Sequence, residues 1–264
     1  MDTVALGLAG AIPLSPLVPW STSVAALPAA TYNHSAVVLP DGRVLVVGGF
    51  GTAAVATVYA YTPSTDTWTT VAPLPVATYH HSAVVLPDGR VLVVGGFGTA
   101  AVATVYAYTP STDTWTTVAP LPVATYRHTA VVLPDGRVLV AGGTTGSGRV
   151  NSCYAYTPST NTWASVSALP AVNEYHSAVV VPDGRALVVG GTNGAAVYAY
   201  MPSTNAWASV APLTTPVERS AAIVLPDGRV LTVAGFAAAA TATVQAAASV
   251  TPGRTGLVGW LASR

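Results

Sequence analysis

The sequence contains no lysine, and only 8% of its 264 residues are charged. In soluble domains, charged residues usually make up about a quarter of the sequence. Ten arginines are balanced by ten aspartates and glutamates, so the formal net charge is zero. Proteins that bind nucleic acid or anionic membranes neutralise phosphates with clusters of Lys and Arg. The composition therefore argues against nucleic acid as a partner.

Cysteine and long apolar runs are also scarce. Cys153 is the only cysteine, so the chain can form no internal disulfide. No apolar run reaches the roughly 20 residues that a membrane-spanning helix needs. The apolar residues are interspersed with Gly, Pro, Ser and Thr, which suits packed sheets and tight turns. We therefore expect no membrane span, and the sequence leaves the compartment open.

What the sequence has instead is an internal repeat. Residues 34–79 and 81–126 are identical, so the period is 47. Self-similarity at this period is typical of propellers and solenoids. One spacer residue escaped the copying, because Asn33 precedes the first copy and His80 precedes the second. We expect the copied residues to be scaffold and the variable ones to carry function.

A hairpin signal opens every repeat. Pro-Asp-Gly-Arg occurs five times, first at residues 40–43. Proline presets φ for a turn and glycine adopts the left-handed conformation that closes a hairpin. The flanking segments 35–39 and 44–47 are short, β-branched and almost wholly apolar. Such segments predict strands that are buried on both faces.

The rest of the repeat predicts a second hairpin. A Gly-Gly pair follows the second strand, and a tyrosine precedes a tryptophan by seven residues in four copies: Tyr61/Trp68, Tyr108/Trp115, Tyr156/Trp163 and Tyr200/Trp207. Together these features resemble the kelch repeat over about residues 28–235. The resemblance implies an all-β fold, a β-propeller of four-stranded antiparallel blades around a central channel, with the first strand of each blade innermost.

Five copies of the first hairpin predict five blades. We interpret residues 1–19 as an N-terminal extension, 20–249 as the propeller and 250–264 as a C-terminal tail. The segment that begins at Trp20 matches a fourth strand, so we expect it to complete the last blade and close the ring. Trp260 in the tail is the alternative source of that strand. Because strands of near-identical copies can exchange, both a monomer and a strand-swapped dimer remain open.

The two faces of such a propeller differ in how much their loops vary. The turns between strands 1 and 2 and between strands 3 and 4 repeat almost unchanged, which indicates a structural face. The opposite face carries the variable loops. At the start of each first strand, one position holds in turn Asn33, His80, Arg127, Tyr175 and Arg219, and the next position holds His34, His81, His128, His176 and Ser220. We expect these side chains to ring the channel mouth.

Three interpretations of the histidine ring compete. The first is that each imidazole satisfies a backbone group of the neighbouring blade. The second is ligand binding, with these candidate residues: Asn33, His34, His80, His81, Arg127, His128, Tyr175, His176 and Arg219. The third is a metal site, but its ligands would have to converge to about 2 Å from one ion, and a propeller channel is too wide. We therefore predict no metal and no cofactor.

The resemblance also bears on specificity. In peptide-binding animal kelch proteins, arginines at the start of the first strand contact the ligand. The matching residues in this chain are His34, His81, His128 and His176. The preference of those proteins for acidic peptides therefore does not carry over.

Catalysis has less support in the sequence. Glu174, Tyr175 and His176 are adjacent, and a carboxylate near an imidazole can do acid–base chemistry. Neighbours along a strand point to opposite faces, however, so adjacency does not make a pair. We assign no catalytic residue. The leading hypothesis is a non-catalytic scaffold that recognises a protein or peptide; a lectin-like glycan binder and an enzyme with its site at the channel mouth are the alternatives.

Overall fold

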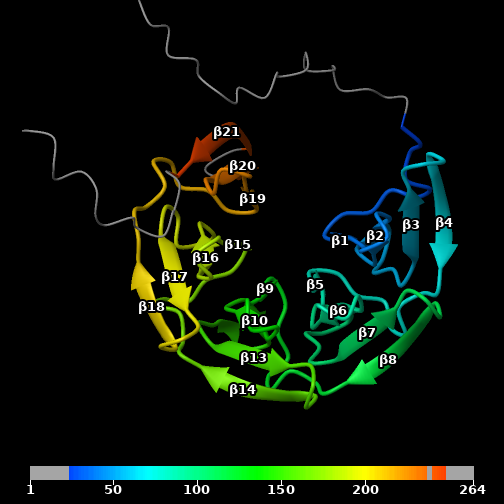
Figure 1. Cartoon of the computed structure of the whole chain (residues 1–264), viewed down its shortest axis with the longest axis horizontal. Coiled ribbons are helices and arrows are strands. Elements are labelled where there is room, and N and C mark those ends of the chain that lie inside the picture. The colour runs from blue at the N-terminus through cyan, green and yellow to red at the C-terminus, as the bar shows by residue number, and fades with distance from the viewer. Residues whose placement is uncertain (1–23, 237–239, 248–264) are drawn as a thin grey trace, which may run out of the picture.

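The computed structural model describes residues 24–236 and 240–247. Every regular element in these residues is a β-strand. They include no helix of the length and apolarity needed to cross a membrane. The strands form five antiparallel blade sheets around a central channel and one small two-stranded sheet (Figure 1). This arrangement confirms the predicted all-β propeller with five blades.

The first two blades have the same four strands: β1 (Ser35–Val38), β2 (Val44–Val47), β3 (Val58–Thr62) and β4 (Thr67–Val71), then β5 (Ser82–Val85), β6 (Val91–Val94), β7 (Val105–Thr109) and β8 (Thr114–Val118). The third blade adds a small hairpin, β11–β12, between its second and third strands: β9 (Thr129–Val132), β10 (Val138–Ala141), β11 (Thr144–Thr145), β12 (Gly148–Arg149), β13 (Cys153–Thr157) and β14 (Thr162–Val166). The last two blades comprise β15 (Ser177–Val180), β16 (Ala186–Val189), β17 (Val197–Met201) and β18 (Ala206–Ser209), then β19 (Ala221–Val224), β20 (Val230–Phe236) and β21 (Ala240–Ala246).

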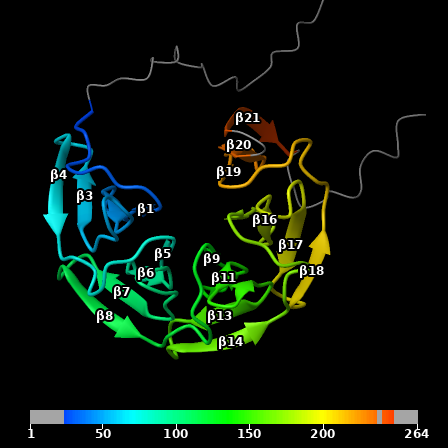
Figure 2. The same cartoon turned by 180° about the vertical axis from the view of Figure 1, so that it is seen from behind.

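The first strand of each blade lies innermost, as expected. Figures 1 and 2 show β1, β5, β9, β15 and β19 around the channel, with the fourth strands on the outside. Each innermost strand contacts the innermost strand of the next blade, from β1 and β5 through to β15 and β19. No comparable contact joins β19 to β1. Within the described residues, the ring is therefore open between blade five and blade one.

Blade five has three strands in the part of the chain that the structure describes. Trp20 and Trp260, the two predicted sources of its fourth strand, lie outside that part. The closure by an N-terminal strand and the domain boundaries at residues 19 and 249 therefore stay predictions.

The Pro-Asp-Gly-Arg turn folds as its residue types dictate. The Leu39 N–H donates to the Arg43 carbonyl at 2.8 Å, and Gly42 adopts a φ of 87°. Arg43 Nε also donates to Asp41 Oδ2 at 2.9 Å, so the two charges of the turn pair locally. The first strand ends at Val38, one residue earlier than predicted, because the backbone of Leu39 already belongs to the turn.

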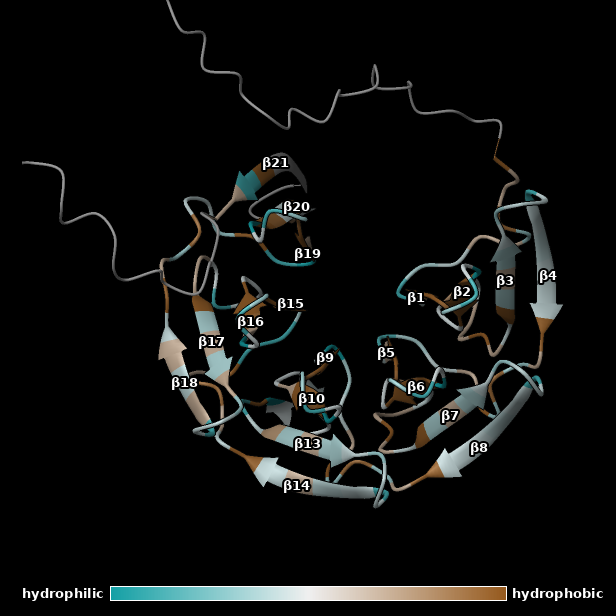
Figure 3. Ribbon diagram, in the orientation of Figure 1, coloured by the Kyte–Doolittle hydropathy of each residue, from teal (hydrophilic) through white to brown (hydrophobic). Residues whose placement is uncertain are grey.

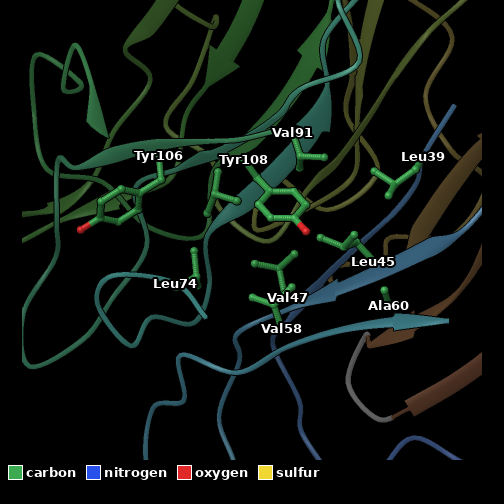
Figure 4. Close-up of a cluster of buried hydrophobic side chains, with 10 residues drawn as sticks. Leu39, Leu45, Val47, Val58, Ala60, Leu74, Val91, Tyr106 and Tyr108 are labelled. Atoms are coloured by element: carbon green, nitrogen blue, oxygen red, sulfur yellow. The ribbon is translucent and has the colours of Figure 1, made fainter. Parts of the chain in front are cut away.

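The buried core lies between blades. The second strands are almost fully buried, whereas the fourth strands are largely exposed, and Figure 3 shows the same change from apolar to mixed character. Figure 4 shows Leu45, Val47 and Val58 of blade one beside Val91 and Tyr108 of blade two, all in one buried cluster. Burial of apolar surface is the main stabilising term in folding. Each blade therefore depends on its neighbours for its core.

An aromatic clasp fastens each of the joints from blade one to blade four on the outer side. Tyr108 packs on Trp115 with ring centroids 4.8 Å apart, and its hydroxyl donates to Asp113 Oδ1 at 2.7 Å. Trp115 Nε1 donates to the Ala72 carbonyl of blade one, and the Ala72 N–H donates to Asp113 Oδ1, each at 2.8 Å. Asp113 has a φ of 52°, which Asp and Asn tolerate better than most residues. The other clasps are Tyr61/Asp66/Trp68 on Ala25, Tyr156/Asn161/Trp163 on Ala119 and Tyr200/Asn205/Trp207 on Ser167.

The duplicated repeat offers a test of the joint, because Tyr61 and Tyr108 have identical sequence neighbours. Tyr108 is 1% exposed, whereas Tyr61 is half-buried. We expect Tyr108→Ala to lower the free energy of unfolding by about 3–5 kcal/mol, as for other buried aromatic residues. Tyr61→Ala should cost less, because blade one has no preceding blade in the described residues. Urea unfolding measures both, and equal losses would contradict a core located between blades.

Candidate binding site

The five variable positions converge at the channel mouth through a shared backbone conformation. Asn33, His80, Arg127, Tyr175 and Arg219 all have positive φ angles, between 54° and 57°. The N–H of each of the last four donates to the carbonyl of the preceding one, at 2.8–3.3 Å. These four hydrogen bonds, which we term the mouth hoop, run from blade to blade. They do not involve the side chains, so the backbone accepts a different side chain at each position.

Two arginines stack on one tyrosine at the mouth. The guanidinium carbon of Arg219 lies 4.1 Å from the ring centroid of Tyr175, and that of Arg127 lies 4.5 Å from it. Arg127 also lies 5.0 Å from the Tyr126 ring. Cation–π contacts of this kind are attractive, especially when partly desolvated. The stack therefore holds two positive charges in fixed positions on blades three to five.

Two glutamates next to the stack balance these charges. Arg127 Nη1 lies 3.1 Å from Glu174 Oε2, which also accepts a hydrogen bond from the Thr144 hydroxyl at 2.5 Å. Arg219 Nε lies 3.9 Å from Glu218 Oε1, and the arginine side chain is more than half exposed. Glu174 therefore positions Arg127, whereas Arg219 keeps donors open to a ligand.

His80 also lies beside the stack. Its ring centroid is 5.8 Å from that of Tyr175. Burial, followed by the positive charges of Arg127 and Arg219, lowers the pKa of His80 to about 4. His80 is therefore neutral near pH 7 and offers one donor and one acceptor to a ligand.

The other histidines of the ring sit below the surface. His81, His128 and His176 are about 95% buried, whereas His34 is exposed. Each buried ring packs over the first glycine of the preceding Gly-Gly pair, and a Cβ atom on Gly95 would lie only 3.0 Å from His128 Cε1. Burial lowers the pKa of His81 and His176 to about 4 and that of His128 to about 3.

The ring nitrogens of the buried histidines differ in their bonding. His176 Nε2 lies 3.1 Å from the Ala141 carbonyl of the preceding blade, as the first interpretation of the ring proposed for each imidazole. His81 and His128 face the matching backbone groups of Val47 and Val94, but their ring nitrogens make no hydrogen bond of good geometry among the described residues. No hydrogen bond joins His176 to Glu174 there, so the two do not form an acid–base pair.

The structure also reveals an aromatic arc, defined by Tyr32, Phe50, Tyr79, Phe97 and Tyr126. The tyrosines precede the variable positions, and the phenylalanines follow the Gly-Gly pairs. Consecutive ring centroids lie 4.9–5.7 Å apart, mostly in edge-to-face geometry. Backbone bridges pair Tyr32 with Phe50 and Tyr79 with Phe97 across each blade. The arc thus lines blades one to three on the same face as the mouth hoop.

The phenylalanines of this arc are not among the residues predicted for the site. Residues shared by the identical copies were expected to be scaffold, and Phe50 and Phe97 are shared. One available signal was that the chain has only three phenylalanines, and each directly follows the second residue of a Gly-Gly or Ala-Gly pair. The third, Phe236, is exposed in blade five, and Arg219 lies 5.9 Å from its ring.

The mouth therefore has two chemically different sides. Aromatic rings line blades one to three. In blades four and five, Glu174 and Glu218 take the tyrosine position. Between the sides lies a hollow of about 240 Å³, lined by both residues of every repeat: Asn33, His34, His80, His81, Arg127, His128, Tyr175, His176, Arg219 and Ser220. Among the described residues, no three His, Cys, Asp or Glu side chains are placed to hold a metal ion.

The geometry matches a known family of propellers. The sequence model of the KLHDC2/KLHL20/DRC7 Kelch-repeats domain matches residues 33–236. The chain belongs to the kelch-repeat family. This confirms the resemblance drawn from the Gly-Gly pairs and the Tyr–Trp spacing. A kelch propeller is a scaffold suited to binding.

Other comparisons bear on the fold alone. The solved structure of YjhT aligns with 79% of this kelch chain and 74% of its own chain, with a TM-score of 0.67 and 20% sequence identity. At that identity, the likeness shows a shared propeller fold. None of the curated proteins compared with this chain matches it.

The buried histidines make stability depend on pH. Their pKa values are below the value of about 6.5 expected in the unfolded chain, so the unfolded state binds more protons below pH 6.5. The free energy of unfolding should therefore fall as the pH drops from 6.5 towards 4, by up to about 1.4 kcal/mol per pH unit for each histidine.

Urea unfolding between pH 7 and pH 5 tests this effect, because most carboxylates titrate below that window. His128→Gln should flatten the dependence, since it removes one titrating group. His34→Gln, at the exposed counterpart in blade one, is the matched control. A pH dependence that His128→Gln leaves unchanged would show that this histidine does not titrate on unfolding.

Proposed function

We propose that this chain is a non-catalytic binding module that recognises a protein or peptide through the face that carries the channel mouth. The observation that carries the proposal is the pairing of the aromatic arc with the Arg127–Tyr175–Arg219 stack on one face. Tyr, Phe and Arg are enriched at protein interfaces, where they supply most of the binding energy, whereas Lys is depleted.

Exposed apolar residues extend this surface outward. Val76, Val123 and Val172 lie in the loops that lead from the fourth strands to the mouth, and each is more than 40% exposed. Tyr32 and Phe236 are exposed on the same face. Contiguous apolar surface with polar groups around it is typical of interaction sites. A protein partner would bury this surface while hydrogen bonding to Arg219.

The site is also organised in advance. The mouth hoop fixes the backbone at all five variable positions. The stack on Tyr175 holds both guanidinium groups, and Glu174 is already hydrogen bonded. Binding then orders few additional groups, which lowers its entropic cost. Because Glu174 is already bonded to Arg127 and Thr144, it is poorly suited to act as a general base, which supports binding over catalysis.

A glycan is the second candidate ligand, favoured by the half-exposed ring of Tyr32. A sugar ring packs on an open aromatic face, and Tyr32 lies at the end of the arc with one ring neighbour. The three inner rings of the arc, Phe50, Tyr79 and Phe97, each contact two other rings of the arc. Tyr126, at the other end of the arc, contacts Phe97 and lies beside His80. The face as a whole therefore offers less open stacking surface to sugars than to apolar side chains.

A displayed library of random peptides tests the proposal. Peptides selected on the wild-type chain should lose at least about tenfold in affinity on Arg219→Ala, because an exposed donor at the mouth is removed. Arg229→Ala is the matched control, since Arg229 is a similarly exposed arginine of the same blade in the opposite turn face. The control should leave the affinity unchanged.

Other outcomes would contradict the assignment. Peptides that bind both variants equally, or that respond only to Arg229→Ala, would exclude the mouth as the peptide site. A glycan array with saturable binding that Tyr32→Ala abolishes, together with failure to select peptides, would favour the glycan instead.

A further inference from the structure

An apolar cavity of about 650 Å³ lies between blades four and five. Its walls include Leu187, Val197 and Val210 of blade four, and Val230 and Ala247 of blade five. In the three preceding joints, a tyrosine and a tryptophan of the following blade pack into the core between the blades. The buried cluster at the fourth joint contains no aromatic residue among the described residues.

The register of blade five explains the missing tyrosine. In blade four, Tyr200 lies opposite Ala186, the residue that follows the turn arginine. In blade five, the corresponding residue is Val230, and its carbonyl accepts from the N–H of Ala247. Ala247 therefore stands where the other blades have a buried tyrosine. A methyl group in place of a phenol leaves most of the cavity empty.

The groups that hold a clasp tryptophan are nevertheless in place. Trp207 Nε1 donates to the Ser167 carbonyl, and the residue of blade four that matches Ser167 is Ala211. Ala211 lines the cavity, and its N–H and carbonyl have no partner among the described residues. Leu213 is only half-buried, whereas its counterparts Leu74, Leu121 and Leu169 are at most 3% exposed. Within residues 24–236 and 240–247, the joint thus lacks a large apolar side chain that donates a hydrogen bond.

We propose that Trp260 fills this cavity and that residues 256–261 form the fourth strand of blade five. The spacing of residues around the turn supports this placement. In blade four, Tyr200 lies two residues before Pro202, and Trp207 lies five residues after it. In blade five, Ala247 lies five residues before Pro252, and Trp260 lies eight residues after it. The segments before and after the proline are therefore each three residues longer in blade five than in blade four.

Because both segments are longer by the same number of residues, the residues that pair across the hairpin stay in register. With the four-residue turn of the other blades, Thr251 lies opposite Gly256 and Ala247 lies opposite Trp260. Tyr200 lies opposite Trp207 in the same way. Directly opposed residues of an antiparallel pair project from the same face of the sheet. Ala247 lines the cavity, so the Trp260 indole enters it, and its N–H reaches the Ala211 carbonyl.

The N-terminal segment fits this place less well. Ala25 accepts from Trp68 Nε1 and donates to Asp66, as Ala72 does with Trp115 and Asp113 of blade two. Ala25 therefore occupies the position that follows a fourth strand in the other blades. In blade one, the tryptophan of the fourth strand, Trp68, lies four residues before Ala72. The residue at the same distance before Ala25 is Ser21. Trp20 is one residue out of register, so a strand from this segment would bring Ser21 to the cavity.

Disulfide trapping in the full chain distinguishes the two strands. The native cysteine is first removed by Cys153→Ala. Gln245→Cys is then combined with Ala262→Cys, its opposite in the proposed hairpin, or with Ser23→Cys, its opposite in the N-terminal alternative. We expect an internal disulfide in the first variant and not in the second, judged by mass with and without reductant. The reverse result, or no disulfide in either, overturns the proposal.

A second measurement does not depend on cysteine. Trp260→Ala should lower the melting temperature by on the order of 10 °C, since it empties a large buried site. Free indole should then bind the cavity and restore part of that loss, as small aromatic molecules do in apolar cavities. Trp20→Ala is the control. Its melting temperature should match that of the wild type and should not change when indole is added. Indole rescue of Trp20→Ala alone would assign the cavity to the N-terminal segment.

Discussion

The contact between neighbouring blades is the interaction on which the rest of this propeller depends. Each blade is too thin to bury its own second and third strands, so its apolar residues find their partners in the next blade, as Val47 and Val58 do against Tyr108. The clasp adds directional bonds through Trp115 and Asp113. Stability in such an array is close to a sum over neighbouring pairs. The joint between blades four and five contains no aromatic residue among residues 24–236 and 240–247, and it is the joint that the proposed insertion of Trp260 would complete.

Most of the fold could be predicted from the sequence because local signals agree with one another. The Asp-Gly turn and the apolar segments around it placed β1 and β2 to within one residue. The fourth strand ends at Val71, because the chain leaves the sheet at Ala72 to bond with Asp113 of the next blade. That bond joins residues 41 apart, and no local pattern in the sequence specifies it.

The site was harder to predict than the fold. The variable positions were recognisable because they differ between identical copies, and the structure brings them together. The depth of the histidines depends on how closely the next blade packs on Gly48 and Gly95, which spacing alone does not give. Phe50 and Phe97 were overlooked because residues shared by identical copies were expected to be scaffold.

In the mouth hoop, the backbone conformation does not depend on which side chains are present. Residues as different as asparagine, histidine, arginine and tyrosine adopt the same φ at the same place, held by bonds between main-chain atoms. Five neighbouring side chains can thus change without disturbing the frame that presents them. Antibody loops offer comparable freedom, but on flexible segments. A propeller of this kind is a rigid template on which new specificities can be selected by randomising five codons.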